Sequence, residues 1–576
     1  MNTQTKKNRD HNTFFNAHTV TGIVISIGLY VIFLCGAFSL FMRNIDNWEM
    51  NANLEKGSTL TDYERVLDTV EGMGYDMHGR DFYIANQKGP TYIFSAPLTD
   101  TMMVKSSLGI LPDSIASGNI SLELDASTFT KLEHEEEHQH AELGDFIYGL
   151  HYFRPIPVVG QYLSGLVALF FFFAIMTGLI IHWKKILKNL FTFRLKSSLK
   201  NLWADAHTAL GVIGLPFQLM YAITGAVFGL TILLFLPYAV VTFEMDRDAM
   251  MAKVYPSIAL ASFEPKGYTG EQGEINALVN KNLSSVKEVH WNDFQVFIKN
   301  YKDEEAHLGI VYFGPPSGES LMASFESTYR LKDGALLNQV NYGEFSTFSK
   351  SMVEFVHQIH FGNYGSYLVK IAYFLAALLT CFMIISGLMI WIKVREKKAF
   401  EKDRKINQRI GRFSIGACMG LFPGLALLFI LTKLIPIGLT DRFAIITYLF
   451  GLFWLVYTAY AMYVKDYTKI TKHAFFLAGV FGLIVPIANG LQSGVWLWRS
   501  IDEGLIDSFF IDTAWLGMGL ISLYLGVTLK SQNQKSRPIE IRETKKEEYL
   551  KKKSKPVFEP KLRAPQPVLN IKSADK

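Results

Sequence analysis

The sequence predicts an α-helical multi-pass membrane protein of about eight transmembrane helices, with an internal duplication and two α+β insert domains outside the membrane. Composition is the first reason, since 49% of the 576 residues are hydrophobic and 14% are aromatic. The second is that several uncharged apolar runs reach the roughly 20 residues that a helix needs to cross about 30 Å of hydrocarbon. The third is a repeated pattern of histidine and glycine. Together they exclude an ordinary soluble globular protein.

The repeated pattern occurs in two copies. The first copy starts at His18 and follows an apolar run to Gly36, and the second starts at His207 and reaches Gly225, so the interval is 18 residues in both. Such a repeat predicts a duplicated unit. The glycines of the pattern allow close approach of helix backbones, or room for a flat cofactor.

A partner stretch also recurs. His151 leads through an apolar segment to Gly178, and His360 leads to Gly387, an interval of 27 residues in both. Each unit therefore consists of one membrane helix, a long insert and a second membrane helix. Four histidines stand at equivalent points of the two units.

The apolar runs divide the chain into consecutive parts. We expect a cytoplasmic N-terminus with the first membrane helix (1–41), a first insert (42–158), the second helix, a loop and the third helix (159–237), a second insert (238–366), the fourth helix with a basic loop (367–412), four additional helices (413–529) and a charged, mobile tail (530–576).

Periodicity adds detail to this division. The third helix is expected to run without a break over about 208–236. A polar helix is expected over 131–150. Alternation predicts strands over 81–85, 91–95, 121–126, 294–298, 308–313 and 327–337.

The distribution of charge predicts the topology. Lys and Arg are concentrated in the loops 184–206 and 393–412, which places these loops and both termini in the cytoplasm and both inserts outside, in the periplasm of a Gram-negative cell. The first apolar run lacks a small-residue cleavage site, so we expect a retained helix of the inner membrane and not a signal peptide. The net charge is +5, but the Lys and Arg residues are concentrated in loops between apolar runs and so indicate topology. We therefore expect membrane lipid as a partner and not nucleic acid.

Cysteine usage limits the chemistry. Cys35, Cys381 and Cys418 all lie in apolar runs, and no CxxCH motif occurs. A disulfide framework, a covalently attached haem and a cysteine-ligated cluster are therefore excluded.

The four equivalent histidines are the candidate ligands. His18 and His207 lie at cytoplasmic helix starts, whereas His151 and His360 lie where the chain re-enters the membrane from outside. Two facing neutral imidazoles without a nearby carboxylate or cysteine suit the two axial positions of a b-type haem iron. We therefore expect the pairs His18–His207 and His151–His360 and two haem b groups, one near each face. The alternative is that histidines at helix ends are interfacial and structural.

Two further histidines have open roles. His182 aligns with Trp391 and could replace one cytoplasmic ligand or be an interfacial anchor, and we favour the anchor. His357 aligns with Tyr148 and remains ambiguous.

Two more histidine sites lie outside the repeat pattern. His134 and His138 would share a helix face and could bind a divalent metal loosely, although a solvated polar face is the better explanation. His473 is expected to be interfacial.

The motifs resemble those of a known family. The two HxxxG starts and the runs ending TGLIIHW (177–183) and SGLMIWI (386–392) are similar to the PepSY-associated transmembrane family, over residues 15–400. Members include iron-regulated membrane proteins and ferric-siderophore reductases of the bacterial inner membrane. The resemblance implies PepSY-like inserts and a reductase with two b haems that delivers electrons to a ferric chelate in the periplasm. It supports His18, His151, His207 and His360, and leaves the last four helices without a counterpart.

The leading hypothesis is therefore an oxidoreductase that transfers electrons across the membrane to a ferric siderophore. Reduction of Fe(III) to Fe(II) weakens a hard-oxygen chelate and needs no catalytic acid, base or nucleophile. No Gly-rich dinucleotide fingerprint follows a strand. The donor is then a quinol or a separate cytoplasmic reductase, and Trp203 and Asp205 are candidate quinol contacts.

Two alternatives belong to other classes. One is a non-redox PepSY protein that binds or regulates an envelope partner. The other is a transporter, for which we expect broken helices with buried carboxylates that the apolar runs do not suggest.

Overall fold

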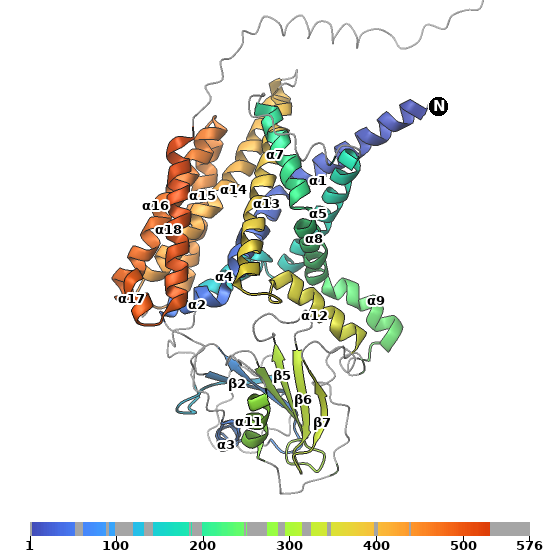
Figure 1. Ribbon diagram of the computed structural model, residues 1–576, viewed down its shortest axis with the longest axis vertical. Helices are drawn as coiled ribbons and strands as arrows, with labels where there is room; N and C mark the ends of the chain where they lie inside the picture. Colours follow the sequence, from blue (N-terminus) through green and yellow to red (C-terminus); the bar gives the residue numbers. More distant parts are fainter. Residues whose placement is uncertain are drawn as a thin grey trace, which may run out of the picture.

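The computed structural model describes most of the chain, and Figure 1 shows a bundle of helices with a β-sheet beyond one end and the N-terminus at the other. The described residues are 3–51, 62–75, 77–87, 91–97, 119–131, 142–183, 186, 199–246, 249, 266, 274–285, 294–313, 324–341, 347–396, 401–436 and 439–529. The tail from residue 530, His134, His138 and most of the loop 184–198 lie outside them, so the expectations for these segments are not tested.

The described part of the chain contains seven helices that are long and apolar enough to cross a membrane, or eight if one bent pair forms a further span. The seven are α1 (Thr3–Ser39), α5 (Gly160–His182), α13 (Tyr367–Arg395), α14 (Glu401–Leu434), α15 (Arg442–Tyr463), α16 (Tyr467–Ser493) and α18 (Ile506–Thr528). The expectation of a helical multi-pass membrane protein is confirmed.

The third helix differs from the expectation because it is broken. The structure has α7 (Leu199–Ile213), α8 (Leu215–Gly229) and α9 (Thr231–Phe243), and α7 and α8 meet at a bend of 70°. Pro216 lies in the first turn of α8, where its missing N–H group leaves no hydrogen bond unmade. Inside one continuous helix the same proline would remove a backbone hydrogen bond and clash with the preceding turn. Hydropathy does not register this break, so the prediction of one continuous helix over 208–236 was wrong.

Short helices lie at the end of the bundle nearest the sheet. They are α2 (Met42–Met50), α4 (Leu143–His151), α12 (Phe348–Phe361) and α17 (Leu497–Asp502) (Figure 1). Of the polar helix expected over 131–150, the described part is α4. Both α4 and α12 directly precede a membrane helix, so they bring the chain back from the sheet to the bundle.

The strands of both inserts form one antiparallel sheet in the order β3-β2-β1-β4-β5-β6-β7. The strands are β1 (Phe82–Gln87), β2 (Thr91–Pro97), β3 (Asn119–Asp125), β4 (Phe294–Lys299), β5 (His307–Phe313), β6 (Ser324–Arg330) and β7 (Leu336–Val340). The inserts join where β1 pairs with β4, with Phe82 opposite Ile298. Two helices, α3 (Tyr63–Gly72) and α11 (Ile275–Ser285), contribute to the same apolar core as the strands.

One expected strand is a hairpin. The run 327–337 divides into the end of β6 and the start of β7, because the amide of Ala335 bonds to the Asp333 side chain and Gly334 has a φ of +66°. Asp and Gly favour such a turn. The prediction of a single strand was wrong at this turn.

The bundle has two parts that meet along α1, α13 and α14. In one part α5 packs on α1 and α8, and α13 packs on α1 and α7. In the other, α14 packs on α15 and α16, and α16 packs on α18. We call α14, α15, α16 and α18 the four-helix unit. Two of the four equivalent histidines lie in the first part, and the other two lie on α4 and α12, which pack against its helices α1 and α8.

Candidate functional site

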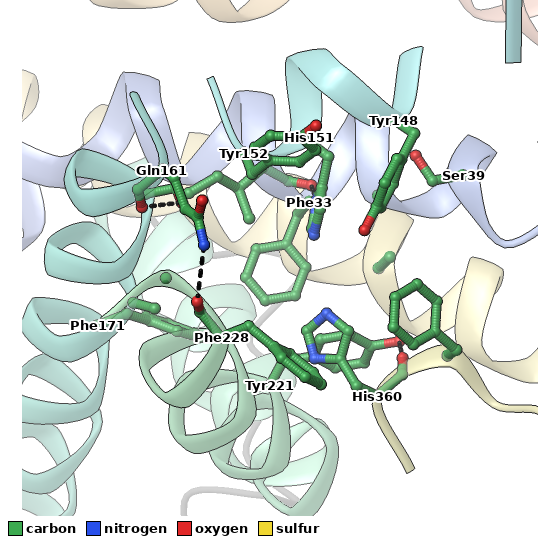
Figure 2. A pocket seen from close by; sticks show the side chains of 18 of the residues that line it. Phe33, Ser39, Tyr148, His151, Tyr152, Gln161, Phe171, Tyr221, Phe228 and His360 are labelled. Atoms are coloured by element: carbon green, nitrogen blue, oxygen red, sulfur yellow. Dashed lines mark hydrogen bonds between the residues drawn. The ribbon is translucent and has the colours of Figure 1, made fainter. Parts of the chain in front are cut away.

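Two of the histidines face each other at the end of the bundle nearest the sheet. His151 is the last residue of α4 and His360 is near the end of α12, and their ring centroids are 6.0 Å apart. Figure 2 shows the two imidazoles on opposite sides of a gap, with Phe33 and Tyr148 beside them. We call this the outer pair.

The hydrogen bonds of the outer pair determine which ring nitrogen is free. Nδ1 of His151 lies 2.8 Å from the carbonyl oxygen of Ile32, which can only accept, so Nδ1 carries the proton. Nδ1 of His360 lies 2.7 Å from the Thr224 hydroxyl, whose single proton is donated to the carbonyl of Met220. His360 therefore also donates from Nδ1. In both rings Nε2 is left with its lone pair, the form in which imidazole binds metals.

Burial favours the neutral form of both rings. It lowers the pKa of His151, and the carbonyl of Ile32 only partly opposes this. Burial also lowers the pKa of His360 well below its ordinary value, with a further lowering from His151 and His357. Two neutral imidazoles can share a metal, whereas two imidazolium ions could not.

A cavity of about 520 Å³ surrounds the outer pair, within the range of small-molecule and cofactor sites. Apolar and aromatic side chains from α1, α5 and α8 form most of its wall, and polar groups are few. Its lining includes Phe33, Tyr148, Phe171, Tyr221, Phe228 and His357 (Figure 2). Such a mostly apolar wall suits a flat, largely apolar cofactor held between the two imidazoles.

The other two histidines form an inner pair with the same design. His18 on α1 and His207 on α7 have ring centroids 6.1 Å apart. Nδ1 of His18 lies 2.8 Å from the carbonyl oxygen of Ala174, and Nδ1 of His207 lies 3.0 Å from that of Met383. These acceptors are equivalent in the repeat, since each stands four residues before the glycine of its TG or SG pair. The duplication therefore extends to the hydrogen bonds of the inner pair.

Three repeat glycines make room for these imidazoles. A Cβ atom on Gly36 would lie 2.6 Å from Nδ1 of His151, and one on Gly387 would lie 3.0 Å from Cε1 of His207. A Cβ atom on Gly178 would lie 3.2 Å from Cε1 of His18. These glycines thus admit a histidine ring against the neighbouring helix. The sequence suggested helix packing or room for a cofactor, and the close contact with the ligands themselves was missed.

The remaining candidate histidines lie elsewhere or play another part. His182 is exposed at the end of α5 but lies close enough to His18 and His207 to interact electrostatically with both. His473 contacts the hydroxyl of Tyr460. His357 stacks on Phe361 with ring centroids 4.4 Å apart and lines the outer cavity. The structure therefore brings together the two expected pairs, with His357 next to the outer pair and His182 near the inner pair.

Hydroxyl groups beside the histidines were not predicted. Besides Thr224, the Ser386 hydroxyl lies 3.2 Å from Nδ1 of His207, and the Tyr221 hydroxyl donates to the carbonyl of His360 at 2.8 Å. A signal was present, because a hydroxyl residue directly precedes Gly178, Gly225 and Gly387.

The arrangement suits a cofactor that brings most of its own metal ligands. Within the described ranges, no three His, Cys, Asp or Glu side chains form a group that could hold a metal ion. Two imidazoles suffice for a flat macrocycle that supplies the other ligands. With imidazole nitrogens about 2 Å from a shared metal, ring centroids would be about 6 Å apart, close to the separations of 6.0 and 6.1 Å in the two pairs.

The fold and the site define a class, a multi-pass helical membrane protein with a β-sheet outside the bundle and two buried histidine pairs within it. Residues 15–393 match the model of a known family, the PepSY-associated TM region. The chain therefore belongs to this family. It is also 23% identical over 300 residues to an uncharacterized protein of Pseudomonas aeruginosa, a match that covers 51% of this chain and 73% of that protein. The family match contains all four paired histidines and ends before α14.

Proposed function

We propose that the protein is a haem-b-containing oxidoreductase that transfers electrons across the bacterial inner membrane and reduces ferric siderophores outside it, for iron acquisition. One observation carries the proposal: four histidines from equivalent points of a duplication form two facing pairs, each ring bonded through Nδ1 and with Nε2 free. A structural role for the histidines would not require this agreement between the copies.

The proposed roles of the residues follow from their contacts. His18 and His207 would hold one haem, and His151 and His360 the other, and each haem would supply reversible one-electron transfer. The bonds from Nδ1 fix the orientation of each ring and make Nε2 a stronger ligand. The substrate is Fe(III) in a siderophore or similar chelate, released more easily after reduction to Fe(II).

The proposal also fixes an orientation. The termini and the basic loops would be cytoplasmic, and the sheet, with two PepSY-type inserts, would be periplasmic. The electron donor would be a quinol or a separate cytoplasmic reductase. Trp203 and Asp205 precede His207 on α7 and so lie near the inner pair, where a quinol could bind. Asp205 is buried, and the ring of Trp203 is 6.0 Å from that of Phe382.

A difference spectrum tests the proposal first. The purified full-length protein, expressed with ample haem, is expected to show sharp b-type bands on reduction with dithionite, with about two haems per chain. Replacing His151 or His18 with alanine should each remove about half of the bound haem, and added imidazole should restore it. The variant His182→Ala is the control, and it should keep both haems.

Activity is measured with a ferric chelate and a coloured trap for Fe(II). The reduced protein should produce the ferrous complex, and the alanine variants of the outer pair should do so slowly. A folded protein without haem would contradict the proposal and favour the non-redox alternative, a PepSY protein that binds an envelope partner.

A transporter is the second candidate, because one specific observation favours it. The span formed by α7 and α8 is broken by a bend of 70°, and broken helices form substrate sites in many transporters. Uptake of a chelate into haem-free proteoliposomes would support this function, and uptake no faster than in empty vesicles would exclude it.

A further inference from the structure

The helix that ends in His151 receives its N-terminal cap from another helix. No side chain of α4 caps its own first turn. Instead, Oε2 of Glu49 accepts hydrogen bonds from the amides of Glu142 and Leu143, each at 2.9 Å. The first amides of a helix have no partner within it, and the helix dipole favours a negative charge there. Glu49 supplies the acceptor and, when its carboxyl group is ionised, the charge.

Glu49 lies on α2, which is held by the four-helix unit. The neighbouring Trp48 is fully buried, and its Nε1 donates to Asp512 of α18 at 2.7 Å. Lys433 of α14 donates to the carbonyls of Trp48 and Glu49 at 2.8 and 2.9 Å, at the C-terminal end of α2. Arg442, at the start of α15, has its Nη1 3.8 Å from Oε1 of Glu49.

A second set of contacts also holds α2 against the four-helix unit. Asp507 of α18 accepts from the side chains of Asn44 and Asn47, each at 2.5 Å. Asn489 of α16 donates to Asp512 at 2.9 Å. Buried polar groups are costly unless they are paired, and here the partners come from α2 and the four-helix unit together. Separation of the two would leave both sides unpaired.

The other outer histidine has a different support. Helix α12 is capped by its own Thr347. Its Lys350 forms a buried ion pair with Glu326 of β6, so the sheet holds the helix that contains His360. The four-helix unit is thus connected to one member of the outer pair through α2 and α4.

We propose that Glu49 is a positioning residue for His151, and that the four-helix unit serves to hold the outer cofactor site through it. The connection runs from Lys433, Arg442 and Asp512 to α2, from Glu49 to the first turn of α4, and along this nine-residue helix to His151. So short a helix is marginal without its cap and its packing. This inference rests on the proposed function.

The experiment uses the full-length protein in detergent or nanodiscs and compares three variants. Glu49→Ala removes the cap, and Glu49→Gln keeps an oxygen that can accept both amides. Asp145→Asn is the matched control, because Asp145 lies in the same first turn but its side chain is 45% exposed. Haem content, the redox titration and the low-spin EPR signals are recorded for each.

The expected result is selective. In Glu49→Ala one of the two low-spin signals should be lost or become high-spin, with a shift of one midpoint potential, while the signal of the inner pair stays unchanged. Glu49→Gln should restore the wild-type signals, and Asp145→Asn should equal the wild type. A purely structural role would lower stability and affect both signals alike, and this outcome would overturn the inference.

A second variant covers the case in which Glu49→Ala does not fold. Glu49→Asp keeps the charge but is one methylene shorter, so it cannot reach both amides, and it should show the same selective change. Two unchanged signals in a folded Glu49→Ala or Glu49→Asp protein would overturn the inference and leave the proposed function intact. Wild-type protein without haem would overturn the proposed function itself.

Discussion

At the scale of single residues, the histidine pairs depend on what each ring touches. Every Nδ1 atom of the four rings has an oxygen partner within 3.0 Å. The nearest helix must therefore approach closely, and Gly36, Gly178 and Gly387 allow that approach. The repeat thus specifies the four rings, the equivalent acceptors of the inner pair and, at three of the four histidines, the space beside the ring.

The glycine contact leads to a prediction for Gly36→Ala. The added methyl would lie 2.6 Å from Nδ1 of His151, closer than real contacts allow, so the ring must move and its bond to Ile32 must break. We expect loss of the outer haem, seen as about half of the haem content and one missing low-spin signal. Gly22→Ala is the matched control, because nothing lies within 4 Å of that position. Equal haem content in the two variants would contradict the argument.

Glu49 leads to a prediction for pH dependence. Burial, with a smaller contribution from Asp46, raises the pKa of Glu49 from 4.5 to about 7, although the amide of Leu143 and Arg442 oppose it. Between these values the native state holds a proton that the unfolded chain releases, so the free energy of unfolding should fall as the pH rises from 4.5 to 7. Thermal unfolding across this range should show a smaller slope for Glu49→Gln. An unchanged slope would assign the pH dependence to other groups.

At the scale of elements, short helices at the outer end of the bundle connect the sheet, the four-helix unit and the histidines. The helix α4 depends on α2, whereas α12 depends on β6. The side chains of Lys350 and Glu326 are only 4% and 2% exposed, so their ion pair is almost entirely removed from water. Glu354 lies 3.5 Å from the same Lys350.

The ion pair leads to a stability prediction. Glu326→Gln leaves a buried Lys350 with a more distant partner, and should cost about 3 kcal/mol of unfolding free energy. The double variant Lys350→Met with Glu326→Leu should recover most of this loss, because no unpaired charge remains. Asp333→Asn is the control, since it breaks an exposed pair with Arg330 and should cost under about 1 kcal/mol. Denaturant titration of the purified protein measures all three.

At the scale of the whole molecule, the sheet lies beyond one end of the bundle and the N-terminus beyond the other (Figure 1). The helix α15 begins beside α2, at the end of the bundle nearest the sheet, so its connection to α16 is at the opposite end of the bundle from the hairpin between β6 and β7. The three native cysteines are buried, so a thiol introduced on either side can be labelled selectively.

The topology is tested with a membrane-impermeant maleimide. Lys332→Cys, in the exposed hairpin, should be labelled in cells whose outer membrane alone is permeable. Lys465→Cys, exposed between α15 and α16, should be labelled only after the inner membrane is opened. The reverse pattern would invert the proposed orientation and place the outer pair at the cytoplasmic face.

Several features of the molecule followed from the sequence itself. Apolar length specifies a membrane helix because hydrocarbon leaves a backbone no other partner. The equal intervals after His18 and His207, and after His151 and His360, were enough to predict both pairs, since a duplicated unit places equivalent residues in register. Strand alternation predicted β1 to β5 for a similar local reason.

Only the tertiary structure decided the rest. The joining of the inserts through β1 and β4 and the cap that Glu49 forms on α4 both depend on contacts between segments far apart in the chain. Glu49 and Leu143 are separated by 94 residues, and no periodicity or spacing relates them. Local patterns report which face of an element is buried, but the partner that buries it is determined by packing of the whole chain.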